Sequence, residues 1–255
     1  MKTMRTVFAG LFSLAAILLL SGCFQAEQII HVKPDGSGTI VMTIKMGKEA
    51  IAQMKAFSGE GGADPLAQMM KQEEAEEMAK KLGEGVKLVK VEPWQQGEFQ
   101  GKRATFSFPD ISKVKADMSM GPDEGDSDDK EPIKFEFTKG NPATLVIHSP
   151  SKKGQADKPD NAEEDAQMAA AAPMMKDMRI TIAVEVEGMI VKTDAEHREA
   201  NRVIIVDLPV GEAMKDIKKF KAIDRAADWP AAAKVIKEIP GAKAESKPKV
   251  TVQFK

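Results

Sequence analysis

Histidines are the first residues in this sequence whose type could support metal binding or proton transfer. His31, His148 and His197 lie far apart, and none has a second histidine at the short spacing that zinc sites use. Ser149 follows His148 directly, but no G-x-S-x-G elbow surrounds a serine, so this pair carries no nucleophile signature. The histidines therefore predict neither a zinc site nor a hydrolase.

Carboxylates cluster in two places. The run from Asp123 to Asp129 invites a calcium interpretation, but its oxygen donors do not follow the D-x-[DN]-x-[DN]-G order of an EF-hand loop. A solvated acidic loop is the interpretation that we favour. A second group could form a weak surface metal site, although an exposed turn is the default: Asp194, Glu196, His197 and Glu199.

Methionines form two further groups, Met118 with Met120, and Met174 and Met175 with Met178. Thioethers are soft ligands that can bind Cu(I). Copper sites of this kind normally add more methionine or histidine at close spacing, so apolar packing accounts for these residues better. No metal or other cofactor is expected, and no group of residues in the chain supports an enzyme.

Cys23 is the only cysteine, and a short apolar segment precedes it. Lys2 and Arg5 precede the apolar run Val7–Leu20, which is the layout of a secretory signal peptide. As a helix this run would reach only about 21 Å, against roughly 30 Å of hydrocarbon in a bilayer. A permanent membrane span is therefore not expected.

The run Leu20-Ser21-Gly22-Cys23 resembles the lipobox of bacterial lipoproteins. The resemblance implies that residues 1–22 are removed as a lipoprotein signal peptide and that Cys23 is the lipid attachment site. An ordinary export signal with a chance cysteine is the alternative. Phe24, where some inner-membrane lipoproteins carry Asp, favours the periplasmic face of the outer membrane in a Gram-negative host that follows enteric sorting.

The composition limits which classes of partner the chain can bind. The formal net charge is −2 at pH 7, so the chain has no basic excess for nucleic acid. With Cys23 used by an anchor, no thiol remains for a disulfide or a thiolate metal site. The expected partners are the membrane, through the N-terminal anchor, with a lipid or other apolar ligand and an envelope protein as further candidates.

Hydrophobic periodicity predicts the elements. The clearest is a hairpin, because Thr39–Met46 alternates apolar and polar residues and Asp35-Gly36 suits a tight turn after Ile29–Lys33. Further strands are predicted at Val86–Val91, Phe99–Phe108, Ile133–Phe137, Thr144–His148, Arg179–Val186, Arg202–Leu208 and Lys249–Phe254. Helices are predicted at Lys48–Phe57, at Pro65–Leu82, at Ile111–Met118, at Val210–Ile223, and from an N-cap at Asp228 to Ile239.

This order predicts an α+β fold with a mainly antiparallel sheet built from hairpins, and with helices packed on one side. Residues 23–255 are expected to form a single extracytoplasmic domain. Two charged segments with little to bury, Gly121–Glu131 and Ser151–Gln167, are predicted to be flexible insertions in it.

Three stretches together resemble the LppM-type domain of bacterial lipoproteins: Val32–Thr39, Gly97–Gly101 leading to Phe106-Ser107-Phe108, and Ile180–Gly188. The likeness covers most of Gln28–Leu208. It implies an α+β domain related to lipid-binding folds that acts at the cell envelope, with no catalytic residues. The chain departs from the family in its insertion at Ser151–Gln167 and in a soluble C-terminal tail, Trp229–Lys255, where the family has a membrane segment.

The expectation for function is therefore a membrane-anchored, non-enzymatic envelope lipoprotein that binds an apolar or amphiphilic molecule between sheet and helices. A structural or interaction subunit of an envelope complex, without a small ligand, is the alternative. The candidate ligand face comes from the first hairpin and the last strand pair: Ile40, Met42, Ile44, Ile180, Ile182 and Val184. These six residues could equally be ordinary core under the helices.

Overall fold

The computed structural model describes residues 24–58, 64–116, 132–150 and 161–255. The predicted signal peptide and Cys23 lie outside these ranges. So do the segment 117–131, which contains the whole of the first predicted insertion, and residues 151–160 of the second. Within the described ranges, no helix is both long and apolar enough to cross a bilayer.

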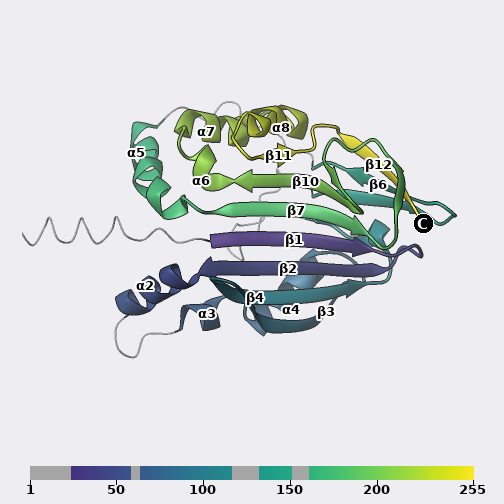
Figure 1. The fold of residues 1–255 in the computed structure, drawn as a ribbon, viewed down its shortest axis with the longest axis horizontal. Helices are drawn as coiled ribbons and strands as arrows, with labels where there is room; N and C mark the ends of the chain where they lie inside the picture. The colour runs from purple at the N-terminus through teal and green to yellow at the C-terminus, as the bar shows by residue number, and fades with distance from the viewer. Residues whose placement is uncertain (1–23, 59–63, 117–131, 151–160) are drawn as a thin grey trace, which may run out of the picture.

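The larger sheet runs through the middle of the molecule (Figure 1). Its strands, in spatial order, are β11 (Lys243–Ala244), β10 (Arg202–Pro209), β7 (Arg179–Val186), β1 (Phe24–Val32), β2 (Gly38–Gly47), β4 (Phe99–Phe108) and β3 (Lys87–Gln96), with β9 (Arg198–Glu199) pairing to β10. Neighbouring strands are antiparallel except β1 and β7, which are parallel. The predicted α+β class and the mainly antiparallel pairing are confirmed.

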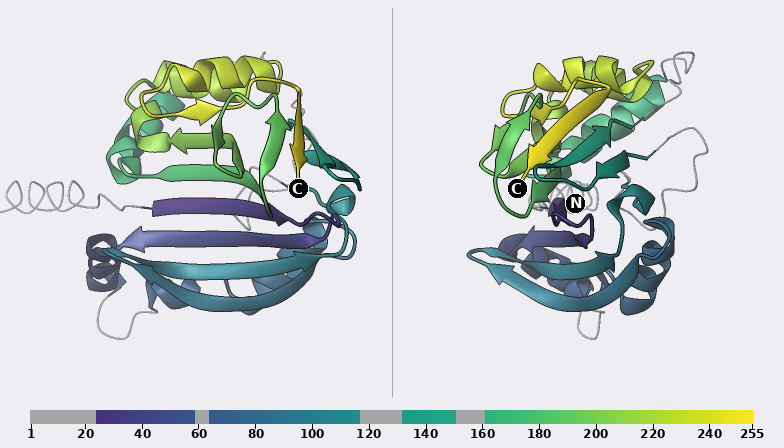
Figure 2. Two further views of the ribbon diagram at one scale, coloured as in Figure 1. Left: turned by 45° about the vertical axis from the view of Figure 1, so that its right-hand side comes forward. Right: turned by 90° about the vertical axis from the view of Figure 1, so that its right-hand side faces the viewer.

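A smaller antiparallel sheet lies at the end of the larger sheet where β1 ends (Figures 1 and 2). Its order is β5 (Lys134–Thr138), β6 (Ala143–His148), β12 (Lys249–Phe254) and β8 (Ile190–Thr193). Buried residues of both sheets form one hydrophobic cluster, in which Phe106 of the larger sheet and Phe254 of the smaller one are both fully buried. The two sheets therefore share a core.

The helices lie at several places around the larger sheet (Figure 2). They are α2 (Lys48–Ser58), α3 (Pro65–Gln68), α4 (Gln72–Lys81), α5 (Ala162–Ala171), α6 (Val210–Ala213), α7 (Ile217–Arg225) and α8 (Trp229–Lys237), with 3₁₀ turns η1 (Ile111–Lys113) and η2 (Ala172–Met175). Helix α4 contacts β3, whereas α8 contacts β11 at the opposite edge of the sheet. The expectation that helices are packed on one side of the sheet is not confirmed. The smaller sheet also packs against the larger one, through the shared core.

The predicted first hairpin is confirmed. Strands β1 and β2 pair from Phe24↔Met46 to Val32↔Gly38, and Gly36 at the turn has φ +88°, which glycine adopts readily. The Asp35 carboxylate accepts hydrogen bonds from the Ser37 hydroxyl and backbone N–H, at 2.7 and 2.9 Å, and these bonds lower its pKa. The turn is thus fixed by residues within a few positions of one another.

The prediction of a single helix at Pro65–Leu82 is wrong, since the helix is interrupted between α3 and α4. Met70 has φ +40°, and Met69 and Met70 pack into different hydrophobic clusters. Helix α4 then starts with the Glu74 carboxylate accepting a bond from the Lys71 N–H at 3.1 Å. Burial of two neighbouring side chains in separate places outweighs the continuous helical pattern.

Two other predicted helices differ from the prediction, since one is divided and the other is reduced to a single turn. Val210–Ile223 divides into α6 and α7, and the Asp216 side chain caps α7 by accepting a bond from the Lys219 N–H at 3.1 Å. At Ile111–Met118 the described residues form only the turn η1, after which Val114 and Ala116 make isolated β-bridges to Gly83 and Ile133.

The second predicted insertion is partly ordered secondary structure. Helix α5 occupies Ala162–Ala171, although composition predicts disorder through Gln167. The Asn161 side chain accepts a bond from the Glu163 N–H at 3.0 Å, and Asp165 forms an ion pair with the buried Lys221 of α7 at 2.5 Å. A local cap and a distant lysine, neither visible in composition, stabilise this helix.

The C-terminal segment is part of the fold. Trp229 of α8 is buried, and its indole N–H donates to the Glu245 carbonyl oxygen at 2.7 Å. Strand β12 has the predicted bounds, and it joins β6 to β8 inside the smaller sheet. The helix and the terminal strand predicted within Trp229–Lys255 are therefore present, and this soluble segment supplies core residues.

Candidate functional site

The structure brings the six predicted ligand-face residues together in three rows across β2, β1 and β7. The rows are Ile40–Ile30–Val184, Met42–Gln28–Ile182 and Ile44–Ala26–Ile180. Strand β1 belongs to the first predicted hairpin, lies between β2 and β7, and contributes the middle residue of each row. We refer to these nine residues as the inner face of the larger sheet.

The inner face is mostly interior. Of the six predicted residues, Ile40, Met42, Ile182 and Val184 are buried, whereas Ile44 and Ile180 are only partly buried. The more open row lies nearest the start of β1. The inner face thus belongs to the shared core and becomes more accessible toward the end of the sheet that carries Phe24.

Gln28 is the exception within this apolar surface. It is 0 % exposed, and neither its Nε2 nor its Oε1 has a hydrogen-bond partner among the residues that the structure describes. Its neighbours in the row are Met42 and Ile182, which offer no polar group except weakly through the Met42 sulfur. A buried amide left unpaired costs about 1–3 kcal/mol, so native proteins normally satisfy it with a protein group, a water or a ligand.

Sequence reasoning missed Gln28 because the first strand was placed from Ile29 onward. The signal is nevertheless present, since Phe24, Ala26, Ile30 and Val32 alternate and Gln28 falls at an inward position of that alternation. The face could not be assembled from sequence, because the parallel pairing of β1 with β7 joins segments far apart in the chain.

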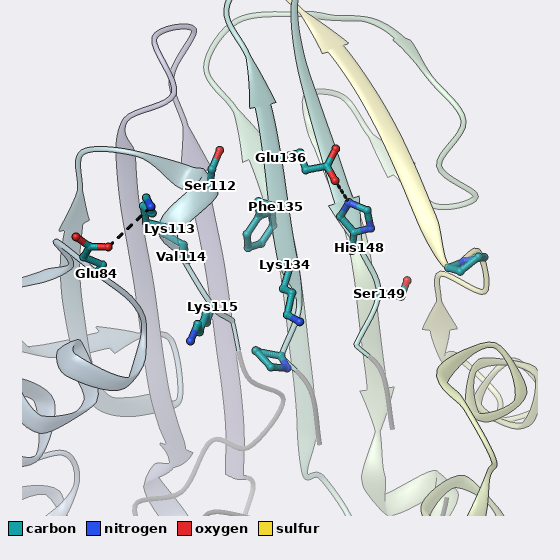
Figure 3. A pocket seen from close by; sticks show the side chains of 12 residues that line it. Glu84, Ser112, Lys113, Val114, Lys115, Lys134, Phe135, Glu136, His148 and Ser149 are labelled. Carbon is teal, nitrogen blue, oxygen red and sulfur yellow. Dashed lines mark hydrogen bonds and ion pairs between the residues drawn. The ribbon is translucent and has the colours of Figure 1, made fainter. Parts of the chain in front are cut away.

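A groove of about 650 Å³ lies between η1 and the smaller sheet (Figure 3). It is lined by Glu84, Ser112, Lys113, Val114, Lys115, Pro132, Lys134, Phe135, Glu136, His148, Ser149 and Pro248. Figure 3 shows Phe135 between two ion pairs, Lys113–Glu84 at 3.9 Å and His148–Glu136 at 2.9 Å. The groove has both polar and apolar walls and contains none of the six predicted residues.

The groove holds no nucleophile arrangement around His148. The Ser149 hydroxyl donates to the Lys247 carbonyl oxygen at 2.6 Å, and His148 Nε2 bonds to Glu136 instead. The serine hydroxyl is therefore bound to the segment before β12, and the histidine ring is bound to Glu136.

The carboxylates at positions 194–199 bind the C-terminal segment. Asp194 accepts a bond from the Thr251 N–H at 2.7 Å, Glu196 pairs with Lys237 and Ser246, and Glu199 pairs with Lys243. The bonds from Lys237 and Ser246 lower the pKa of Glu196. In the described part of the chain, no three His, Cys, Asp or Glu side chains are grouped to hold a metal ion.

Replacing Glu196 with glutamine is expected to lower stability modestly at pH 7, by no more than about 1 kcal/mol for this partly exposed pair. The folded-state pKa lies below the ordinary value of 4.5, so the ionised form stabilises the fold above that value. The contribution is lost as the pH falls through the folded pKa, and wild type and variant should then converge. Urea unfolding at pH 7 and pH 3 measures this, with the exposed Glu187→Gln as control.

Comparisons with known proteins give little guidance. No family model and no curated protein matches the chain. Among solved structures, the NMR structure of the folded domain of LppM from Mycobacterium tuberculosis is similar, with 8 % identity, a TM-score of 0.36, and coverage of 91 % of this chain and 90 % of that chain. A likeness at this level assigns no role to any residue of this chain.

Proposed function

We propose that this protein is a lipid-anchored, non-enzymatic protein of the bacterial cell envelope whose domain binds an apolar or amphiphilic molecule along the inner face. The observation that carries the binding proposal is Gln28, a fully buried amide without a partner in an otherwise apolar surface. Its position is what a hydrocarbon ligand with one internal polar group would require.

The anchor is supported by the order of residues at the N-terminus. Cys23 closes the lipobox-like run, and β1 begins at the very next residue, Phe24. A thioether-linked diacylglycerol at Cys23 would hold the domain directly on the membrane. An extracytoplasmic location follows from the export signal, on the outer membrane's periplasmic face if the host is Gram-negative.

The ligand is expected to satisfy the Gln28 amide. The amide nitrogen can donate to an ester or amide carbonyl, and its oxygen can accept from a hydroxyl or N–H group. The apolar neighbours in the three rows would contact hydrocarbon on either side. Entry would occur by the more open row of Ile44 and Ile180, which lies toward the start of β1 and hence toward the anchor.

Replacing Gln28 with leucine is expected to stabilise the ligand-free domain by about 1–3 kcal/mol, because it removes an unpaired buried amide at similar volume. The same variant should retain less lipid, since the polar contact is lost. Denaturant unfolding measures the first effect, and native mass spectrometry of protein purified from its own membrane measures the second. Gln25→Leu, on the opposite face of the same strand, is the matched control and should change neither quantity.

Two outcomes would count against this proposal. If Gln28→Leu destabilises the domain by more than Gln25→Leu does, the amide has a structural partner and marks no ligand position. If wild-type protein carries no lipid and binds no fluorescent fatty acid at micromolar levels, the ligand is absent and the inner face is core only.

An interaction subunit is the second candidate, and a separate surface favours it. Met189, which precedes the edge strand β8, is 58 % exposed, and Val191, within β8, is 40 % exposed. An edge strand with exposed apolar side chains can pair with another protein. This candidate gains weight if the ligand tests fail.

A further inference from the structure

We propose that the corner of the larger sheet formed by Lys45, Trp94, Phe99 and Arg103 rests in the phospholipid headgroup layer of the membrane that carries the anchor. We call these four residues the aromatic–cation corner. The inference goes beyond ligand binding, and it rests on the proposed acylation of Cys23.

No residue separates the proposed lipid attachment site, Cys23, from the first residue of β1. Consecutive Cα atoms are about 3.8 Å apart, so an acylated Cys23 would hold Phe24 within one residue of the bilayer surface. Phe24 is already in β1, paired with Met46, and it packs against a small cluster containing Met46, Ala50 and Ile51. The end of the sheet where β1 begins is therefore fixed next to the membrane, with no flexible linker to let the domain turn away.

Strand register places Trp94 at the same end. Phe24, Met46, Gln100 and Gln95 form one row across β1, β2, β4 and β3. Trp94 belongs to the next row, with Gln25, Lys45 and Gly101. The hairpin of β3 and β4 thus ends level with the start of β1, on the left in Figure 1.

Simple lengths put this row within the headgroup layer. One Cα step of about 3.8 Å and one strand residue of about 3.4 Å place the Trp94 row roughly 7 Å from the Cys23 Cα along the strands. The headgroup layer is about 5–7 Å deep on each side of the hydrocarbon. Three strand spacings separate β1 from β3, about 14 Å across the membrane surface, so the anchor and the corner can touch the bilayer together.

The corner has the side chains of a membrane interface. Lys45 Nζ lies 5.1 Å from the centroid of the Trp94 ring and 5.9 Å from that of Phe99, and the Arg103 guanidinium lies 5.6 Å from Trp94. Gly101 stands between Lys45 and Trp94 in the row, so no side chain separates them. Tryptophan rings sit at headgroup level, and lysine and arginine reach phosphates from beside them.

Most acidic residues near the aromatic–cation corner form ion pairs with lysines. Glu92 pairs with Lys90 at 2.9 Å, and Glu98 at the hairpin pairs with Lys48 at 3.8 Å. Glu27 lies on the same face, opposite Thr43. Because the surface carries both signs of charge, we expect the aromatic rings to insert among the headgroups, and we do not expect binding by net charge alone. The corner should therefore bind neutral as well as anionic phospholipids.

The chain's two tryptophans make the proposal testable in one sample. Trp94 is part of the corner, whereas Trp229, in α8, is buried and hydrogen-bonded to the Glu245 carbonyl oxygen, so it serves as an internal control. The acylated protein would be reconstituted into phosphatidylcholine vesicles containing a headgroup spin-labelled phosphatidylcholine. Wild-type emission is expected to fall about twofold, since an interfacial ring meets the label, whereas Trp94→Phe should lose almost none of its Trp229 emission.

Equal and negligible quenching of wild type and Trp94→Phe in vesicles would overturn the membrane contact. That result is distinguishable from failure of the anchor, which appears as absence of the acyl group on Cys23. In that event the thiol of Cys23, the chain's only one, can be coupled to a maleimide phospholipid, so that the same quenching experiment tests the corner with a tether supplied chemically. Quenching of Trp94 there would support the corner even though acylation had failed.

Discussion

Replacing Cys23 with alanine is expected to move the protein from the membrane fraction to the soluble fraction almost completely. Two acyl chains hold a protein stably on a bilayer at about 0.8 kcal/mol per buried methylene, whereas a single chain binds only marginally. Labelled fatty acid should enter wild type and should not enter the variant. Fractionation of cells grown with the label measures both effects.

The control for this substitution is the stability of the domain. Cys23 precedes β1, so the variant should unfold at the same denaturant concentration as the soluble domain with cysteine. Unchanged stability would show that loss of membrane binding reflects the missing anchor. Equal labelling of wild type and variant would refute acylation at Cys23.

Replacing Phe254 with alanine is expected to lower the free energy of unfolding by about 3–5 kcal/mol, the usual cost of removing a buried phenyl ring. Phe254 is 0 % exposed near the end of the chain, and its ring centroid lies 6.4 Å from that of Phe137 in β5. It pairs with Ala143 on one side and Ile190 on the other. Urea unfolding followed by circular dichroism measures the change.

Lys249→Ala is the matched control, because Lys249 is exposed at the start of the same strand. A change within about 0.5 kcal/mol is expected there. If Phe254→Ala were as mild as this control, β12 would contribute little to the core.

The two functional candidates, a ligand-binding domain and an interaction subunit, predict different roles for Gln28. A scaffold gains nothing from a buried unpaired amide, which lowers stability without a compensating contact. A binding protein can use it, since the ligand supplies the missing partner and its binding energy is added to the stability of the fold. The stability of Gln28→Leu therefore distinguishes the two more directly than substitutions of the apolar residues around it.

Elements whose signals are local were predictable. Strands β4, β7 and β12 have the predicted bounds, because each alternates apolar and polar residues within its own length. Helix α8 begins where Asp228 predicts, with that carboxylate accepting a bond from the Ala231 N–H at 2.8 Å. The break at Met70 and the helix α5 were not predictable, since burial against distant residues decides both.

The sequence alone determined the anchor hypothesis, the α+β class and the six apolar residues of the predicted ligand face, because each depends on residues within a few positions along the chain. Tertiary structure alone decided that β1 pairs in parallel with β7, that Gln28 is buried between Met42 and Ile182, and that Lys45 and Trp94 meet beside the start of β1. Such pairings join segments far apart in sequence. They are selected by the burial of side chains from all of these segments in one core, and no local pattern carries that information.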